Sequence, residues 1–528
     1  MPLQAFIVNP ASGKLDMSSA PSLVAPGDFV IAENIEYDIS GSKKKRLGTT
    51  RYNATVISGA TQVTALSDYW RHALTLSGTQ KFVAHAGTVI YKDDGDGVWD
   101  SLKTTWGAAA KDQNICIAQG YAVISTSNND TPQIYDQTNI ADLNAGALPK
   151  FTAATYHLRR LFTVGETAAL SGAVNPSRST FSAAGDITLF TGSDTGNLIF
   201  DDDDGDFLVG VSQPLRGRLY FFKGPFRGSI HVVGGRSPTT FEKAPVCRGI
   251  PCVSHKSIIT TANDVYWVSP YGIHSLVMTE KYGDTQEVFL SRAVQSLFNR
   301  VNFARVGQIA GFHAPHRNII GWSLPIGTST TNDTTLVYNY AREAWAVWTH
   351  TGLDAASFMT ARNPLAGTSN LKPSLYIGSY AGFVYNAEQT VLADDDATRS
   401  YTSRLRSPAH YRLDRVPELQ EKVFHSVCSF IKPAAATAQL QTNIDNRSAS
   451  YTIDLAAGSG ADLIGSTFVI GTSLIGSGLE TSYIETPIED RGRGIQLEWS
   501  LGGTNQNLEL YGYGIRYTPT EPTAMERS

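Results

Sequence analysis

Short apolar runs, each followed by a glycine or proline turn and a second apolar run, recur along most of the chain. Residues 263–276 read NDVYWVSPYGIHSL, and aromatic and β-branched runs on either side of a Pro/Gly turn predict a β-hairpin. Looser versions of this pattern lie at 81–91, 115–125, 218–233 and 375–385. Hairpins that repeat at intervals of tens of residues are typical of radial or stacked β architectures.

The spacing of the hairpins predicts an all-β chain with a β-propeller-like domain over residues 27–385, built from about 6–8 irregular blades of roughly 35–55 residues each. Residues 1–26 show no clean period and are expected to form an extended N-terminal arm. Residues 386–420 are richer in charge and predict a linker or exit strand. Six strand-like runs within 421–517 predict a C-terminal β-sandwich, followed by a polar tail over 518–528.

Composition narrows the range of partners. Charged residues make up 17% of the chain, below the roughly 25% that is typical, which favours a surface that other subunits partly cover. The formal net charge of −5 gives no bulk attraction to nucleic acid or to an anionic membrane. No apolar run approaches the roughly 18–20 residues of a membrane span, and the first residues lack a signal-peptide pattern. We therefore expect no membrane span and assembly in a cytoplasm.

An acidic run, DDDDGD, occupies residues 201–206. Asp202, Asp204 and Asp206 are candidate ligands for Ca²⁺, which prefers roughly six to eight oxygen ligands on flexible loops. The EF-hand spacing fails because no glutamate stands at the twelfth position, and a solvated acidic turn between two strands explains the run as well. We expect no metal and no other cofactor, with these three residues as the weak alternative.

Two further acidic clusters predict turns. Asp93, Asp94, Asp96 and Asp100 surround two glycines in an expected hairpin turn, and the three aspartates at 394–396 lie in the expected linker, where they are predicted to be exposed. Acidic turns that line a channel would repel phosphate groups and keep a passing duplex from binding.

Lys43, Lys44, Lys45 and Arg46 form a basic run. The run lies between two expected strands, so a solvated hairpin turn is the simplest interpretation. The functional interpretation is docking on an acidic partner or contact with nucleic acid.

The histidines and cysteines give no strong metal signal. His313 and His316 are spaced for two ligands on one helical face, but Pro315 between them argues against a helix, and a structural or surface role is expected. The four cysteines are too sparse for a disulfide framework and are predicted to be small buried residues, at positions 116, 247, 252 and 428.

The chain has no G-x-S-x-G elbow, no P-loop and no dinucleotide-binding fingerprint. Glycosidases use two carboxylates about 5–9 Å apart. The sequence does not show which carboxylates lie close together in the fold. The acidic residues near strand-like runs include Asp333, Glu343, Glu33, Glu36 and Asp38. We therefore expect a protein that is not an enzyme.

Four phrases of the chain resemble the tail nozzle and tail hub proteins of tailed bacteriophages. Residues 27–52, GDFVIAENIEYDISGSKKKRLGTTRY, look like the opening of the propeller in that family, and residues 263–276 look like its most recognisable hairpin. TTLVYNYAREAWAVW at 334–348 is similar to one of its blades, and GRGIQLEWSLGGTNQNLELYGYGIRY at 492–517 is similar to the closing strands of its sandwich. The resemblance lies in blade phrases and brings no catalytic or metal motif.

The resemblance implies a structural virion protein of a tailed phage of the short-tailed type. In that family the nozzle is a six-fold ring below the portal and adaptor, which ends the DNA channel, retains the packaged genome and permits its ejection. The implied partners are other copies of this chain in a homo-hexamer, adaptor or connector proteins, and tail fibres or spikes. Double-stranded DNA would pass transiently without specific binding. The implied location is the tail of the virion, assembled in the host cytoplasm.

Two other functions stay open at this stage. The first is a propeller glycoside hydrolase or lyase acting on host surface polysaccharide, which needs a convergent carboxylate pair in the central pocket. The second is a receptor- or carbohydrate-binding module with exposed aromatic residues such as Trp70, Trp99 and Trp322, although the large apolar area of each indole favours the core.

Overall fold

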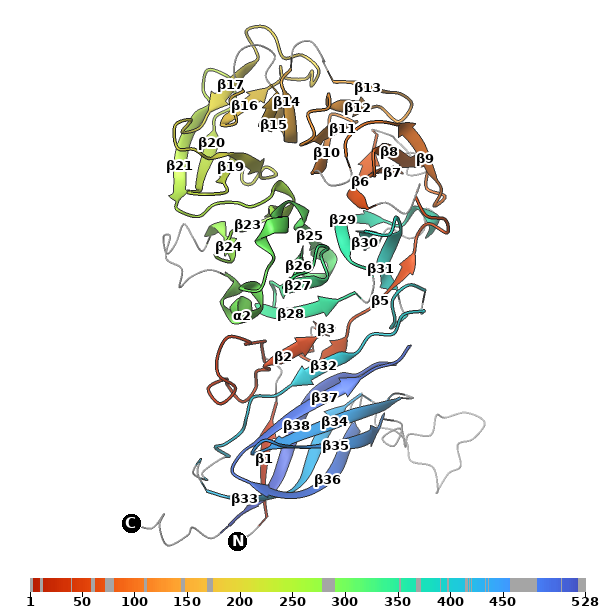
Figure 1. Cartoon of the computed structure of the whole chain (residues 1–528), viewed down its shortest axis with the longest axis vertical. Coiled ribbons are helices and arrows are strands. Elements are labelled where there is room, and N and C mark those ends of the chain that lie inside the picture. Colours follow the sequence, from red (N-terminus) through yellow and green to blue (C-terminus); the bar gives the residue numbers. More distant parts are fainter. Residues whose placement is uncertain are drawn as a thin grey trace. The chain divides into compact units, whose positions relative to one another are not determined.

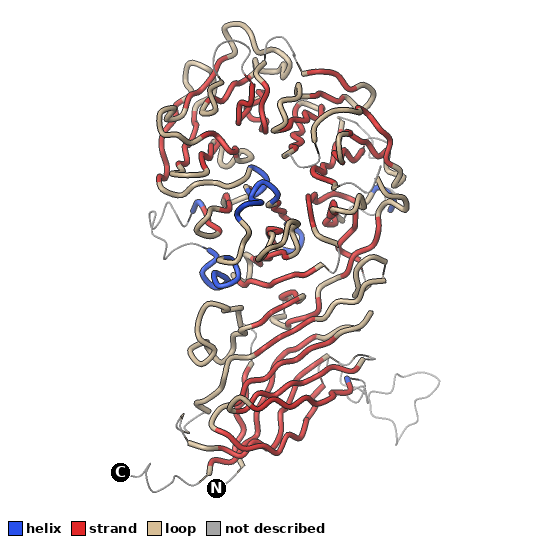
Figure 2. Tube along the Cα trace, viewed as in Figure 1, coloured by secondary structure: helices blue, strands red, loops and turns tan. Residues whose placement is uncertain are grey.

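The computed structural model describes residues 3–9, 13–38, 40–57, 62–71, 80–108, 112–143, 148–168, 174–277, 290–350, 353–366, 372–389, 391–396, 398–413, 416, 418, 420–432, 434, 436–455, 482–504 and 506–520. Strands dominate, and helices are few and short (Figure 2). The chain forms two compact units: a propeller unit of residues 50–336 and 352–388, and a sandwich unit of residues 1–49, 337–351 and 389–528.

Seven sheets of the described residues surround the centre of the propeller unit (Figure 1). The first strands of neighbouring sheets are in contact, except between the fourth and fifth sheets, where residues 255–257 contact both sheets. Each sheet is therefore a radial blade. Four blades are four-stranded antiparallel meanders: β6 (Val63–Trp70), β7 (Gln80–Ala86), β8 (Val89–Asp93) and β9 (Trp99–Lys103); β10 (Gln113–Ala118), β11 (Tyr121–Thr126), β12 (Gln133–Tyr135) and β13 (Ile140–Asp142); β14 (Lys150–His157), β15 (Arg160–Ala168), β16 (Arg178–Phe181) and β17 (Gly196–Ile199); β18 (Phe207–Val211), β19 (Leu219–Gly224), β20 (Ser229–Gly234) and β21 (Glu242–Arg248).

The remaining three blades depart from this plan. The fifth has three strands, β22 (Ile259–Thr260), β23 (Val265–Val268) and β24 (Ile273–Ser275). The sixth contains β25 (Ala310–Ala314), β26 (Ile319–Leu324) and β27 (Thr334–Asn339), and the chain leaves the propeller unit within β27. The seventh combines β29 (Ala355–Arg362), β30 (Pro373–Ser379) and β31 (Val384–Gln389) with β5 (Gly48–Arg51) from far earlier in the chain.

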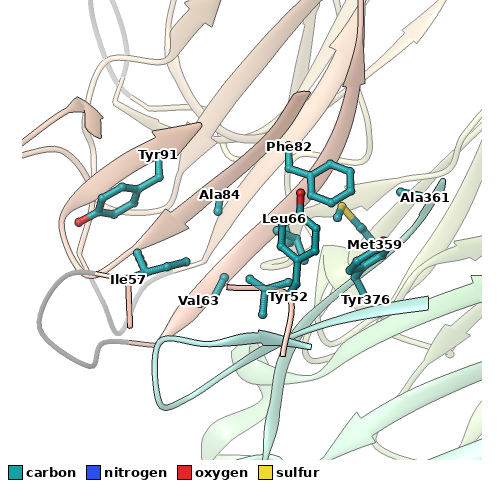
Figure 3. Packing of buried hydrophobic residues seen from close by; sticks show 12 residues of the cluster. Tyr52, Ile57, Val63, Leu66, Phe82, Ala84, Tyr91, Met359, Ala361 and Tyr376 are labelled. Carbon is teal, nitrogen blue, oxygen red and sulfur yellow. The ribbon is translucent and has the colours of Figure 1, made fainter. Parts of the chain in front are cut away.

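The ring of blades closes between the seventh blade and the first. The rings of Tyr52, Phe82 and Tyr376 pack together with centroids 5.2–5.6 Å apart, and Met359 lies in the same cluster (Figure 3). The backbone N–H of Tyr52 donates to the carbonyl of Val384 at 2.8 Å. Closure therefore combines hydrogen bonds within the seventh blade, where the segment after β5 pairs with β31, and an aromatic cluster packed between this blade and the first. Aromatic side chains bury large apolar areas and dominate core energetics.

The sandwich unit consists of two sheets. One has the order β3 (Ile35–Tyr37), β4 (Lys43–Lys45), β38 (Glu509–Pro519), β33 (Lys422–Ile431) and β36 (Ser482–Gly492), with β1 (Gln4–Val8) also on β38. The other has the order β28 (Ala344–Thr349), β2 (Ile31–Glu33), β32 (Ser403–Arg406), β37 (Ile495–Leu501), β34 (Thr437–Ile444) and β35 (Arg447–Asp454). Trp499 of β37 joins them: its ring packs on Tyr513 at 4.9 Å, and its indole N–H donates to Ser429 Oγ at 3.0 Å.

The expected all-β fold, with a propeller and a sandwich, is confirmed, but the domain boundaries differ. Residues 27–49 belong to the sandwich unit and not to the propeller. The expected arm over residues 1–26 contains β1, which pairs with β38 from Gln4 opposite Tyr517 onward. The expected linker over 386–420 contains β32, a strand between β2 and β37. Sequence order hides this arrangement because the sandwich draws its strands from three separate stretches of the chain.

The described helices are short segments between strands: η1 (His255–Ser257), η3 (Leu290–Val294), α2 (Gln295–Phe298), η4 (Phe303–Gln308), η5 (Pro315–Arg317) and η6 (Pro364–Ala366). Among the described residues, no helix has the length and apolar character needed to cross a membrane.

Candidate functional site

Two adjoining pockets of about 180 and 330 Å³, together called the axial cavity, lie among the inner strands of the propeller unit and have Asn114 and His255 in common. Residues of β6, β10, β25, β29 and the η1 region line the smaller pocket, and residues of β14, β15 and β18 contribute to the larger one. The first strands of six blades therefore contribute to its walls. A central pocket with a few convergent polar groups is the default place to look for binding or catalysis.

The charged groups of this cavity are already paired. The Asp112 carboxylate lies 3.6 Å from the Lys256 ammonium, and the Glu166 carboxylate lies 2.6 Å from the Arg178 guanidinium. Burial, with a smaller contribution from the charge of Lys256, lowers the pKa of His255 to about 4, so this imidazole is neutral at pH 7. The walls thus offer neutral hydrogen-bonding groups and compensated charges, which suit water or a small polar molecule.

Asp112 and Glu166 are the carboxylates that sequence reasoning missed. Asp112 immediately precedes β10, and Glu166 lies near the end of β15. Finding them from sequence would have required knowing how the strands of each blade pair, because that pairing decides which residues face the cavity. The carboxylates singled out from sequence have other local partners: Asp333 accepts the Ile326 N–H, Glu343 pairs with Lys14, Glu33 with Arg404, Asp38 with Lys44, and Glu36 accepts the Leu47 N–H.

Asp206, in the loop before β18, fixes the turn between β19 and β20. Its carboxylate accepts the backbone N–H groups of Phe226, Arg227 and Gly228 at 2.9, 2.9 and 2.6 Å. Asp206 is 4% exposed. Hydrogen bonds to an ionised acceptor are stronger than neutral ones, so this carboxylate gives the turn one defined conformation.

The other two calcium candidates of the run, Asp202 and Asp204, do not converge on a common site with Asp206. The Asp204 carboxylate accepts from the buried Lys223 ammonium at 2.7 Å, and the same ammonium donates to the Phe200 carbonyl at 2.9 Å. The Lys223 ammonium therefore already compensates the charge of Asp204. Asp202 is exposed. Nowhere in the described ranges do three or more His, Cys, Asp or Glu side chains gather in a way that could hold a metal ion.

The second acidic cluster forms the predicted turn, between β8 and β9. Asp93 is fully buried, and its carboxylate accepts from the Tyr52 hydroxyl at 2.5 Å and from the Gly97 N–H at 2.8 Å. Asp94 lies between the ammonium groups of Lys81 and Lys92, at 2.5 and 2.7 Å. These carboxylates stabilise the turn and the closure of the propeller.

Both interpretations of the basic run, a solvated hairpin turn and docking on a partner, are wrong for three of its four residues. Lys43, Lys45 and Arg46 are at most 1% exposed. The ammonium of Lys43 donates to the Gly41 carbonyl and that of Lys45 to the Gly503 carbonyl, both at 2.9 Å. Lys44 alone reaches the surface, where it pairs with Asp38. Lys43–Lys45 form β4 of the sandwich unit, and Arg46 directly follows this strand.

Arg46 of the basic run and Asp394 of the third acidic cluster compensate each other's buried charge. The Arg46 guanidinium donates to the two carboxylate oxygens of Asp394 at 3.0 and 2.6 Å and to the Thr349 carbonyl at 2.9 Å. It also stacks on the Tyr401 ring at 3.8 Å. Asp394 and Asp395 are buried, at 0% and 2% exposed, so the prediction of an exposed 394–396 cluster is wrong for these two residues.

Other candidates lie in structural positions. His313 is on β25 and His316 in η5, and no helix joins them. Trp322 is fully buried, with its indole N–H donating to the Ser257 carbonyl at 2.8 Å. Trp70 and Trp99 are half-buried. All four cysteines are buried and unbridged, as predicted.

No protein-family model and no curated protein matches the chain. Similar solved structures include YCF48 from Cyanidioschyzon merolae, at 9% identity and a TM-score of 0.40 over 65% of this chain and 99% of that one. A structure titled glycoside hydrolase matches at 10% identity and a TM-score of 0.26, over 88% and 99% of the two chains. A nidogen/laminin complex matches at 9% and 0.28, over 51% and 93%. Likeness at this level carries no argument about activity.

Proposed function

We propose that this chain is a structural subunit of a bacteriophage tail, a nozzle or hub of the short-tailed type. Copies of the chain form a ring that continues the DNA channel below the portal and adaptor, retains the packaged genome, permits its ejection and anchors fibres or spikes. The chain has no catalytic role in this proposal.

One observation carries the proposal: three of the four phrases that resemble this family contain framework strands of the fold. The fourth, residues 27–52, lies mainly in the sandwich unit and not at the opening of the propeller. Residues 263–276 contain β23 and β24, with Trp267 fully buried. Residues 334–348 cover β27 and most of β28, and residues 492–517 contain β37 and most of β38. A resemblance confined to exposed loops would say little, whereas these strands define the blades and the sandwich that the family is expected to have.

The build of the sandwich unit supports a load-bearing role. Its strand β38 pairs with β33 and also with β1 and β4, so strands from both ends of the chain share one sheet. Backbone pairing of this kind resists separation of the chain ends during DNA passage. The net charge of −5 gives the chain no bulk attraction to DNA phosphates, which suits a conduit through which DNA passes without binding.

The direct test is a phage in which the gene for this chain is disrupted. The proposal expects heads that package DNA but lose it, measured as genome sensitivity to DNase in purified particles. Particles that keep their DNA and their tails would contradict it. Depolymerisation of a surface polysaccharide by the purified chain, lost in Asp112→Asn and Glu166→Gln variants, would instead favour a hydrolase or lyase acting through the axial cavity.

A further inference from the structure

The fourth blade presents an aromatic side chain on a fixed turn. Phe226, between β19 and β20, is 74% exposed. The three hydrogen bonds from the turn to Asp206 hold its backbone in place, and Arg227 beside it is exposed. Aromatic and arginine side chains are enriched at binding hot spots, and a turn already in one conformation loses little entropy when it binds. This tip has the character of a binding anchor.

Exposed negative charge accompanies this tip. Asp202 and Asp203 lie in the same loop as Asp206 and are exposed. Their neighbours Asp201 and Asp204 pair with Arg248 and Lys223, but the salt bridges of the described residues include neither Asp202 nor Asp203. The hydrogen bond and charge of Asp202 raise the pKa of Asp203, because two adjacent carboxylates repel each other. A cationic surface placed here would relieve that repulsion.

The opposite end of the same blade carries exposed positive charge. Since β18, β19, β20 and β21 run antiparallel, the connections 212–218 and 235–241 lie at the end away from Phe226. They contain no Asp or Glu, and they carry Arg216, Arg218 and Arg236, all exposed. None of these arginines takes part in a salt bridge among the residues that the structure describes. Asp202 and Asp203 thus lie at one end of the blade and Arg216, Arg218 and Arg236 at the other. Exposed Arg227 accompanies the first set, and exposed Glu242, the first residue of β21, adjoins the second.

We propose that these two ends bind each other in different copies of this chain. The Phe226 tip with Asp202 and Asp203 of one copy docks on Arg216 and Arg218 of the next, where a guanidinium can stack on the Phe226 ring. Charge complementarity selects this register and accelerates association. The choice of a second copy as occupant rests on the proposed function, since a heterologous contact of this kind closes into a ring when the rotation between copies allows it.

Charge reversal tests the contact. The tip variant Asp202→Lys/Asp203→Lys and the basic-end variant Arg216→Glu/Arg218→Glu are compared with wild type by sedimentation velocity at low salt. We expect wild type to associate with increasing concentration and each variant to associate at least tenfold more weakly. An equimolar mixture of the two variants is expected to recover association, because each then meets an end of opposite charge.

Matched controls separate this contact from other causes. Arg292→Glu/Arg300→Glu changes net charge as the basic-end variant does, at exposed arginines outside the fourth blade, and is expected to associate like wild type. Phe226→Ala is expected to weaken association while the circular dichroism spectrum stays unchanged. Wild type that remains monomeric up to about 100 μM at low salt overturns the contact, since screening is weakest there.

The contact and the proposed function fail in different ways. If wild type associates, and both variants and their mixture associate as strongly as wild type, this contact is overturned. Ring formation would then use another surface. Association that follows the charge-reversal pattern supports the contact even if the chain proves absent from phage tails, in which case only the proposed function falls.

Discussion

The Arg46 guanidinium donates two hydrogen bonds to the Asp394 carboxylate, although the two residues are 348 positions apart in the chain. The two side chains are 1% and 0% exposed. Burial alone would raise the pKa of Asp394, but the charge and hydrogen bonds of Arg46 outweigh it and lower the pKa. This pair joins the stretch before the propeller unit to the stretch after it, within the sandwich unit.

Removing one partner of this pair should destabilise the sandwich unit strongly. Arg46→Met or Asp394→Leu leaves an uncompensated buried charge, which costs about 3–5 kcal/mol, whereas replacing both partners by apolar residues is often close to neutral. We expect urea unfolding to show a large loss for each single variant and a much smaller loss for the double variant. Losses that simply add would show that the two charges act independently.

Acid should weaken the sandwich unit through His350. Burial and the charge of Arg46 lower the pKa of this histidine to about 4. The folded state then binds fewer protons than the unfolded chain, whose histidine titrates near 6.5, so stability falls as pH drops below about 6.5 and levels off below about 4. His350 alone should contribute a loss of about 2 kcal/mol between pH 7 and pH 5.

The test compares urea unfolding of wild type and His350→Phe at pH 7 and pH 5. The variant should lose less stability between pH 7 and pH 5 than wild type. Groups that titrate in both proteins cancel in this comparison, and they include Asp68, whose burial raises its pKa to about 6. Equal losses in wild type and His350→Phe would contradict this assignment.

Asp206 should control the rigidity of the Phe226 turn. In Asp206→Ala the N–H groups of Phe226, Arg227 and Gly228 lose a charged acceptor, and hydrogen bonds to charged groups contribute about 1.5–3 kcal/mol each. We expect hydrogen exchange of these three amides to accelerate at least tenfold, while exchange in β19 and β20 changes little. Asp202→Ala is the matched control, and equal exchange rates in the two variants would refute the role of Asp206.

Calcium should not stabilise the propeller unit through the 201–206 loop. The Lys223 ammonium already neutralises Asp204, so added Ca²⁺ finds no vacant ligand set there. Thermal unfolding with about 1 mM Ca²⁺ or with EDTA is expected to give the same midpoint, within about 1 °C. A calcium-dependent rise of several degrees in the unfolding midpoint that disappears in Asp204→Ala would show that the metal displaces Lys223 from Asp204.

Local patterns predicted the blades well because a hairpin is a local structure. The run VYWV became β23 and IHS became β24, and the S-P-Y-G turn between them forms around Ser269, whose hydroxyl accepts the Tyr271 and Gly272 N–H groups. The turn of Asp93 and Asp94 followed the same logic. Alternation and turn chemistry were sufficient wherever consecutive strands pair.

Contacts between residues far apart in the chain could not be predicted from local sequence patterns. Nothing within residues 43–46 indicates burial, because the acceptors of Lys45 and Arg46 come from Gly503 and Asp394. The axial cavity was missed for the same reason. Asp112 and Lys256 meet only when separate blades close the ring, so no local spacing relates them.

The most direct test of the conduit is the mass and shape of the purified protein, by light scattering followed by electron microscopy of the same sample. The account predicts a closed ring whose central opening admits a DNA duplex, about 20 Å across, with a subunit number that matches the phage tail. A compact monomer that also fails to assemble when mixed with portal and adaptor proteins would contradict it.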